Sequence, residues 1–185
     1  MEDRAEGTDR RRTKKGLVIV HTGKGKGKTT AALGLVFRAW GHGMRVCVLQ
    51  FIKRKNKNLG EVKAAAKLGI EWHQIGEGFV WHPTQDQEAK AKARRAWVLA
   101  QEKIASRAYD LIVLDEFTYV LKFGWLDPEE VLTWLAENKP SELHLIITGR
   151  DAVPALVEYA DLVTDMGNVK HPFEQGVRAQ QGIEF

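Results

Sequence analysis

The chain has 185 residues, of which 44% are hydrophobic and 28% are charged, and its formal net charge is +4. These values are ordinary for a globular protein, and the length predicts one domain with a substantial core. No apolar run approaches the ~20 residues of a membrane span, and the N-terminus is polar rather than signal-like. The single cysteine, Cys47, excludes an intrachain disulfide and a cysteine-paired zinc site, so we expect a cytoplasmic protein with no membrane partner.

Residues 1–15 form a polar, charged segment ahead of the first apolar run. A basic stretch over residues 10–15 supplies part of the positive charge, and acidic residues nearer the start dilute it. Two interpretations stay open: a flexible, solvated tail, or an arm that orders over an anionic ligand or partner. Because the charge is diluted, the sequence argues against nucleic acid as the partner.

Apolar runs alternate with helical patterns along the rest of the chain. The helix pattern at 128–138 is preceded by Asp127, which predicts an N-cap followed by proline at the first helical position. Several of these runs are continuously apolar instead of alternating apolar with polar residues, as expected for parallel strands that are covered on both faces. The sequence therefore predicts an α/β fold of three layers, with a mostly parallel central sheet of about six strands flanked by helices. The predicted strands are 17–21, 45–51, 70–74, 111–115, 143–148 and 162–165, and the predicted helices are 28–40, 61–68, 86–106, 128–138 and 152–160.

Two features of these elements predict core packing. Cys47 lies within an apolar run, so we expect a buried thiol rather than a reactive one. Ala89, Ala93, Trp97 and Ala100 fall on one stripe of the longest predicted helix, as residues that pack against a sheet do.

A glycine- and lysine-rich turn joins the first predicted strand to the first predicted helix, with the sequence Thr-Gly-Lys-Gly-Lys-Gly-Lys-Thr-Thr over residues 22–30. Strand, glycine-rich turn and helix together predict a phosphate-binding loop rather than an ordinary surface turn. Backbone N–H groups converge there on anionic oxygens, and the helix N-terminus adds partial positive charge. Lys28 can reach the phosphates, and the Thr29 hydroxyl is placed to bind Mg²⁺. The candidate nucleotide-binding residues of this loop are Gly23, Lys24, Gly25, Lys26, Gly27, Lys28, Thr29 and Thr30.

One position departs from the general phosphate-loop pattern, which has glycine where this chain has Thr22. Nucleotide binding survives this departure, but the usual orientation of the nucleotide need not.

The apolar strand predicted over 111–115 ends in two carboxylates, Asp115 and Glu116. An unpaired buried charge is costly, so both need partners. Beside a phosphate loop the pair predicts Mg²⁺ ligands, direct or through water; a helix or turn cap is the alternative. In many ATPases the second carboxylate activates water, so ATP hydrolysis with a nucleic-acid or protein partner is the alternative function.

Over residues 16–185 the chain resembles the ATP:corrinoid adenosyltransferases of the P-loop type, which make adenosylcobalamin. Thr22 is also what this family shows in place of the first glycine. The resemblance implies one P-loop nucleotide-binding catalytic domain over residues 16–185, with residues 1–15 as a flexible tail. It rests on the phosphate loop together with Gln50-Phe-Ile-Lys53, Gly78-Phe-Val-Trp81, Val113-Leu-Asp-Glu-Phe-Thr-Tyr119, Ile147-Thr-Gly-Arg150 and the terminal block over residues 169–183.

The resemblance implies transfer of the 5′-deoxyadenosyl group from ATP to the cobalt of a reduced corrinoid, cob(I)alamin or cobyrinic acid diamide, with release of triphosphate. Co(I) attacks the ribose 5′ carbon, and ATP lies reversed relative to ordinary P-loop enzymes. Lys24, Lys26, Lys28 and Mg²⁺ could then stabilise the departing triphosphate. Arg38 and Arg150 are candidate phosphate or corrin-edge contacts, with a surface ion pair as the alternative for each.

The resemblance also assigns Phe79 and Trp81 to an apolar wall that displaces the lower axial ligand of cobalt and so eases its reduction. Residues two apart in an extended segment share a side, which suits such a wall, although an ordinary half-buried strand has the same spacing. His82 as an axial cobalt ligand is the lesser alternative, because a strong ligand would oppose reduction. A flavoprotein reductant and a homodimer are implied as partners.

Some positions receive no individual role. Lys24 and the pair His82-Pro83 differ from what many family members carry, and the terminal block contains Lys170, His171, Arg178 and Gln180. A nucleoside kinase and a non-catalytic corrinoid carrier are the remaining alternatives. The kinase has no obvious use for the Phe79–Trp81 element, and the carrier would not need Lys28, Thr29 and Glu116 together.

Overall fold

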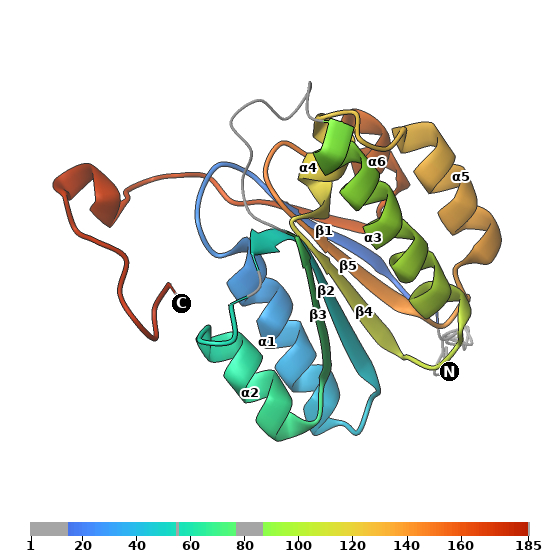
Figure 1. Ribbon diagram of the computed structural model, residues 1–185, viewed down its shortest axis with the longest axis horizontal. Coiled ribbons are helices and arrows are strands. Elements are labelled where there is room, and N and C mark those ends of the chain that lie inside the picture. Colours follow the sequence, from blue (N-terminus) through green and yellow to red (C-terminus); the bar gives the residue numbers. More distant parts are fainter. Residues whose placement is uncertain (1–14, 55, 77–86, 185) are drawn as a thin grey trace, which may run out of the picture.

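The computed structural model describes residues 15–54, 56–76 and 87–184, in which strands and helices alternate (Figure 1). The first half contains β1 (Val18–Thr22), α1 (Lys28–Gly41), β2 (Val46–Arg54), α2 (Gly60–Leu68), β3 (Glu71–Gly76) and α3 (Gln87–Ala105). The second half contains β4 (Leu111–Asp115), α4 (Phe117–Lys122), α5 (Pro128–Asn138), β5 (His144–Thr148), α6 (Pro154–Tyr159), β6 (Leu162–Asp165) and the 3₁₀ turn η1 (Pro172–Gln175).

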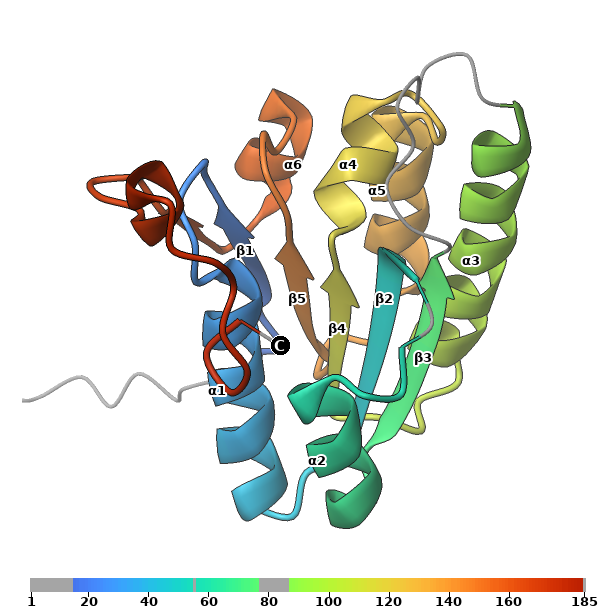
Figure 2. The ribbon, with the colours of Figure 1, turned by 60° about the vertical axis from the view of Figure 1, so that its left-hand side comes forward.

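The strands form one six-stranded sheet in the order β3-β2-β4-β5-β1-β6, and every pairing is parallel. Helices α1 and α2 lie on one face, and α3, α4, α5 and α6 lie on the other (Figure 2). The predicted three-layer α/β fold with a parallel sheet of six strands is confirmed. Because all strands are parallel, their carboxyl ends meet at one edge, where α/β proteins bind ligands.

The hydrophobic core has two parts, one on each face of the sheet. Alternate side chains of β1 show the division: Val18 and Val20 pack toward α3–α6, whereas Ile19 packs toward α1. In the larger part, the Phe117 ring lies 5.3 Å from Trp97 and 4.8 Å from Phe51, centroid to centroid. This burial on both faces explains why the strands carry unbroken apolar runs.

Several local predictions are confirmed. The Asp127 side chain accepts hydrogen bonds from the backbone N–H groups of Glu129 (2.9 Å) and Glu130 (3.1 Å), which makes it the N-cap of α5. Cys47 is a free, buried thiol. The predicted stripe of the longest helix is buried in the core, and its members are Ala89, Ala93, Trp97 and Ala100.

The observed bounds of the helices and strands differ from the predicted bounds by up to three residues, and two short elements were not predicted. The helix expected over 152–160 begins at Pro154, because proline suits the first turn of a helix. Helix α4 and the turn η1 span six and four residues, too short for a helical period to stand out from sequence.

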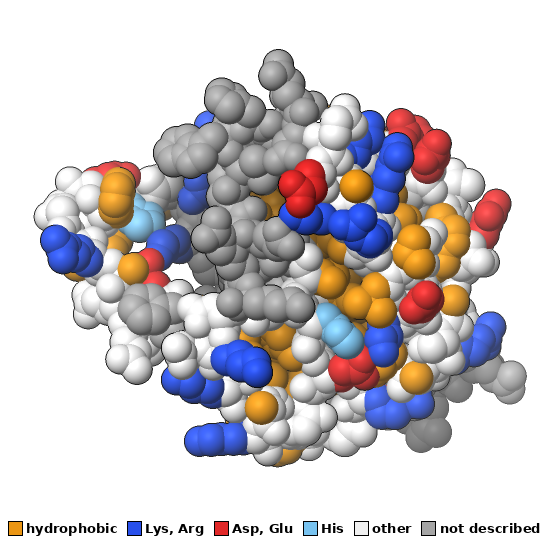
Figure 3. Space-filling model, in the orientation of Figure 1, with side chains coloured by type: hydrophobic (Ala, Val, Ile, Leu, Met, Phe, Trp, Pro, Cys, Tyr) orange, Lys and Arg blue, Asp and Glu red, His pale blue; other side chains and the backbone are white. Residues whose placement is uncertain are grey.

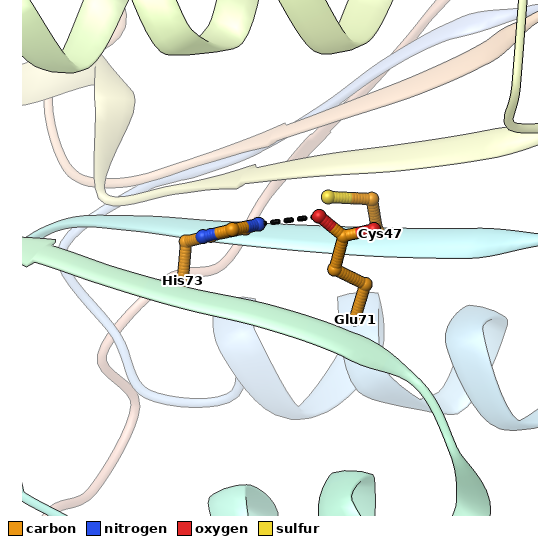
Figure 4. A group of neighbouring side chains, drawn as sticks. All are labelled: Cys47, Glu71 and His73. Atoms are coloured by element: carbon orange, nitrogen blue, oxygen red, sulfur yellow. Dashed lines mark hydrogen bonds and ion pairs between the residues drawn. The ribbon is translucent and has the colours of Figure 1, made fainter.

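A polar cluster that includes Cys47, Glu71 and His73 lies on the face of the sheet away from α1 (Figure 4). One Glu71 oxygen lies 2.6 Å from Lys103 Nζ of α3 and 2.6 Å from His73 Nε2, and the other accepts a hydrogen bond from Tyr109. Cys47 Sγ lies in the same group, which has the residue types of a metal site. Burial raises the pKa of Cys47 to about 12, and Lys103 already neutralises Glu71, so we interpret the cluster as a structural ion-pair network.

We expect Glu71→Gln to destabilise the protein more at pH 7 than at pH 3. Burial raises the pKa of Glu71, but hydrogen bonds from Lys103, Tyr109 and His73 outweigh burial and lower it from 4.5 to about 2. A lowered carboxyl pKa stabilises the fold above pH 4.5, and this contribution is lost as the pH falls toward 2. Urea unfolding of the variant and the wild type at both pH values measures the difference. The exposed Glu102→Gln serves as the control, and an equal difference at both pH values would contradict the assignment.

Among the described residues, no helix has the length and apolar character needed to cross a membrane. On the face shown in Figure 3, Lys and Arg side chains lie among Asp and Glu side chains rather than forming one broad basic patch.

Candidate active site

The phosphate loop lies between β1 and α1 at the carboxyl edge of the sheet, and its backbone is left-handed at two glycines. Gly23 and Gly27 have φ angles of 98° and 105°, in the left-handed region that side chains disfavour. A Cβ at Gly23 would lie 2.5 Å from the backbone nitrogen of Met166. Gly27 caps α1, and its carbonyl accepts the hydrogen bond from the Ala31 N–H at 2.7 Å. The loop therefore presents the N-terminus of α1 to a ligand above the sheet.

Thr22, the departure from the general loop pattern, is the last residue of β1 and is buried. Its hydroxyl accepts a hydrogen bond from the backbone N–H of Ala152 at 3.1 Å, and its carbonyl accepts one from Met166 at 2.9 Å. Glycine could not make the first of these contacts. Threonine at this position thus joins the loop to the segment that follows β5.

Lys28 is buried at the base of the loop, with 7% of its surface exposed. Its ammonium donates hydrogen bonds to the carbonyl oxygens of Gly23, at 2.8 Å, and Gly25. Burial lowers its pKa, and the nearby charge of Arg150 lowers it further, against the opposing influence of Glu116 and other carboxylates. Two cationic side chains therefore share this small region, as a polyanionic ligand would require.

The Asp115 carboxylate joins the loop to the sheet. Its Oδ1 accepts hydrogen bonds from the hydroxyls of Thr29 (2.8 Å) and Thr148 (2.7 Å), and its Oδ2 accepts one from Gln50 Nε2 (3.0 Å). Asp115 is 1% exposed, and three polar partners offset the cost of burying its charge. Thr29 and Asp115, both predicted as Mg²⁺ ligands, are therefore in direct contact.

Glu116 follows with a strained backbone, at φ 62° and ψ 22°. This left-handed conformation is uncommon for residues with a side chain and often occurs at functional sites. The Glu116 N–H donates to Thr148 Oγ1 at 3.0 Å, so one threonine fixes both acidic residues. Sequence analysis included Thr148 in the Ile147–Arg150 block but gave it no role; its signal was a polar residue at the carboxyl end of a buried strand, as for Asp115.

A cavity of about 680 Å³ opens above the loop, a volume within the usual range of small-molecule sites. Residues 25–30 of the loop form one side, and Glu116, Tyr119 and Arg150 lie along the edge of the sheet. Burial raises the pKa of Tyr119, and the charge of Glu116 raises it further, so its hydroxyl stays protonated. The remaining lining residues are Leu33 of α1, Gly60 and Glu61 of α2, and Pro172, Gly182, Ile183 and Glu184 of the C-terminal segment.

The structure brings most of the predicted site residues together at this cavity, but it separates three groups. Gly23, Lys24 and Asp115 do not line it; Gly23 is buried at the start of the loop, Lys24 is exposed, and Asp115 is buried at the end of β4. Arg38 is exposed on the last turn of α1, at the opposite end of that helix from Lys28. Its place does not support contact with phosphate. Phe79, Trp81, His82 and Pro83 lie outside the described residues.

His21, next to the loop on β1, is 7% exposed, and neither of its ring nitrogens has a hydrogen-bond partner in the part of the chain the structure describes. Burial lowers its pKa below the usual 6.5. The unfolded chain therefore takes up a proton first as the pH falls, so stability decreases below about pH 6.5.

We expect His21→Phe to raise the free energy of unfolding by roughly 1–2 kcal/mol at pH 7.5, because it removes buried polar atoms without partners. The gain should be larger at pH 5.5, where the histidine of the unfolded wild type is protonated. Urea unfolding at the two pH values measures both effects. A variant with the same pH dependence as the wild type would show that His21 does not titrate as described.

Comparisons with known proteins identify the family of the chain. A family model described as "ATP:corrinoid adenosyltransferase BtuR/CobO/CobP" matches residues 14–185. The chain belongs to this family. The corrinoid adenosyltransferase of a Sinorhizobium species is 42% identical to it over 92% of this chain and 81% of the relative. Those of Pseudomonas aeruginosa and Escherichia coli K12 are 42% and 41% identical, and each alignment covers 86% of the relative and 94% or 92% of this chain.

The family establishes the activity in outline. The protein catalyses the ATP-dependent transfer of the adenosyl group to a corrinoid, as the resemblance predicted. Among solved structures, the flagellar accessory protein FlaH of Methanocaldococcus jannaschii is similar, with a TM-score of 0.55 over 81% of this chain and 70% of that protein. At 10% sequence identity, this likeness shows a shared fold alone.

Proposed function

We propose that residues 16–185 act as one catalytic domain in which triphosphate is held in the cavity above the phosphate loop while Co(I) attacks the ribose 5′ carbon. The carbon–oxygen bond to the triphosphate breaks, its electrons leave with the triphosphate, and a carbon–cobalt bond forms. The observation that carries the proposal is the grouping of Lys26, Lys28 and Arg150 around one cavity at the N-terminus of α1. A whole triphosphate carries several negative charges, so its departure needs positive charge along its length.

Lys28 is the central donor in this proposal. Its ammonium now bonds to carbonyl oxygens of the loop, and a phosphate oxygen would offer a stronger, charged acceptor in their place. Arg150, exposed at the other side of the cavity, can bind phosphate oxygens in a bidentate manner. Lys26 pairs with Glu184 and would exchange this partner for phosphate.

The donor set around Thr29 suits Mg²⁺, which prefers hydroxyl, carboxylate and phosphate oxygens. The Thr29 hydroxyl donates its hydrogen to Asp115, so the lone pairs of its oxygen remain for a cation. Asp115 and Glu116 supply carboxylate charge beside it, directly or through water. When bound, Mg²⁺ would neutralise part of the charge on the departing triphosphate.

The phosphate-containing product released from ATP distinguishes this proposal from ATP hydrolysis by Glu116. The protein is incubated with ATP, Mg²⁺ and chemically reduced cobalamin, and the phosphate products are separated by ion-exchange chromatography. Triphosphate that appears only with the corrinoid is the expected result. ADP and phosphate released without the corrinoid would overturn the proposal in favour of hydrolysis.

We also propose that Phe79 and Trp81 form the apolar wall against the corrin. Support comes from the family and from their position in the chain, shortly after β3 ends at Gly76 at the carboxyl edge of the sheet. We expect Trp81→Ala to bind ATP normally but to turn over cob(II)alamin slowly with a reductant, since the lower ligand would stay on cobalt. Normal turnover from cob(II)alamin, with a defect only from prepared cob(I)alamin, would contradict this role.

The proposed setting of the enzyme is the cytoplasm, with a flavoprotein as reductant and a homodimer as the working assembly. Family membership supports these proposals, and sedimentation velocity tests the assembly directly.

A further inference from the structure

A row of polar side chains crosses the sheet beneath the phosphate loop, although the strands around it are apolar. Gln50 of β2 pairs in register with Asp115 of β4 on one side and with Gln74 of β3 on the other. Side chains in one such row point to the same face of a sheet. Asp115 contacts Thr29 of α1, so the row faces α1 and the nucleotide site.

Gln50 is the centre of this row, and it is completely buried. Its Nε2 donates to Asp115 Oδ2 at 3.0 Å, and its Oε1 accepts from Trp72 Nε1 at 3.0 Å and Gln74 Nε2 at 3.2 Å. The reverse amide orientation would set N–H groups against two other donors and oxygen against a carboxylate. The surroundings therefore fix the amide in the orientation that donates to Asp115.

Because the Gln50 amide is a neutral donor, it affects the Asp115 carboxylate differently from a cationic side chain. A lysine or arginine would neutralise Asp115, whereas an amide orients it and leaves its negative charge in place. Oδ2 is held by Gln50, and Oδ1 is directed to Thr29 and Thr148. The carboxylate thus keeps both its direction and its charge for a cation at Thr29.

The row continues from Gln50 to the far wall of the cavity. Gln74 Oε1 accepts from the backbone N–H of Asn56 at 3.0 Å, and Asn56 Oδ1 accepts from the N–H of Asn58 at 2.9 Å. These residues lead directly into α2, whose first residues, Gly60 and Glu61, line the cavity. Hydrogen bonds therefore connect Asp115, through Gln50 and Gln74, to the segment that leads into α2.

We propose that Gln50 is a positioning residue for adenosyl transfer: it orients Asp115 for a divalent cation and connects that carboxylate, through Gln74, to the α2 wall. This inference rests on the proposed role of Asp115. Gln50 is completely buried and does not line the cavity, so it acts on the reaction through the side chains that it orients.

The test compares the Mg²⁺ dependence of turnover in variants of Gln50. Gln50→Met keeps the length and volume of the side chain but removes the donor to Asp115. Gln50→Glu keeps the acceptor for Trp72 and Gln74 but places a negative charge against Asp115. We expect the Mg²⁺ concentration for half-maximal turnover to rise about tenfold in Gln50→Met and further in Gln50→Glu. The KM for the corrinoid should stay within twofold. Wild-type Mg²⁺ dependence in Gln50→Met would overturn the inference.

Two controls separate positioning from stability and from the proposed function. Val48→Ala removes a buried side chain from the same face of β2, and we expect it to lower the melting temperature with wild-type Mg²⁺ dependence. A Mg²⁺ shift in Val48→Ala equal to that in Gln50→Met would overturn the inference as well. If Asp115→Asn retains full activity, the proposed role of Asp115 fails; if Asp115→Asn is impaired and Gln50→Met is not, the inference about Gln50 fails by itself.

Discussion

Lys28→Ala is expected to reduce adenosylation by about a hundredfold or more at saturating ATP, because one well-placed donor is worth ~3 kcal/mol at the transition state. Lys28 is buried at the base of the loop, where no exposed lysine can replace it. The effect should fall mainly on kcat, since charge on the bridging oxygen develops as the carbon–oxygen bond breaks. The measurement is the rate of formation of adenosylcobalamin from prepared cob(I)alamin.

Lys26→Ala is the matched control for Lys28→Ala. Lys26 belongs to the same loop but is exposed, and it already pairs with Glu184. We expect a loss of tenfold or less. Adenosylation by Lys28→Ala within a few-fold of the wild type would show that triphosphate stabilisation does not depend on this residue.

Asp115→Asn is expected to have the second large effect, a loss of about a hundredfold in kcat with a strongly weakened response to Mg²⁺. The substitution keeps the shape of the side chain but removes its charge. It also turns an N–H donor toward either Gln50 or the hydroxyls of Thr29 and Thr148, which now all donate to the carboxylate. Turnover is measured over a range of Mg²⁺ concentrations.

Asp127→Asn provides the comparison for Asp115→Asn, because asparagine caps a helix as well as aspartate does and Asp127 lies at the start of α5. We expect this control to keep wild-type turnover and stability. If Asp115→Asn keeps the wild-type response to Mg²⁺, the carboxylate does not serve a cation, and its hydrogen bonds to the loop are structural.

The sequence predicted the features that depend on local patterns. Continuous apolar runs predicted buried parallel strands, and the carboxyl edge of the sheet followed from that arrangement. The structure therefore places the glycine-rich turn ahead of Lys28 and the carboxylates at the end of β4 on the same edge of the sheet, as expected. These predictions held because each depends on a few neighbouring residues and on one rule of parallel sheets.

Other features depend on register and on contacts between distant segments, which no local pattern contains. Gln50 and Thr148 were read as parts of strands, and only the pairing of β2, β4 and β5 reveals that both bond to Asp115. Arg38 was predicted as a phosphate or corrin-edge contact, and the structure places it on the last turn of α1, away from the phosphate loop. Helix α4 was not predicted because its six residues are too few to show the helical repeat of apolar residues.

The wall of the cavity built by Pro172, Gly182, Ile183 and Glu184 has a consequence for biosynthesis of the enzyme. The opposite wall, residues 25–30, is among the first parts of the domain to leave the ribosome, whereas these residues are made more than a hundred positions later. A nascent chain with its loop already folded still lacks this boundary of the cavity. The complete cavity therefore forms only after the last of these residues has emerged from the exit tunnel.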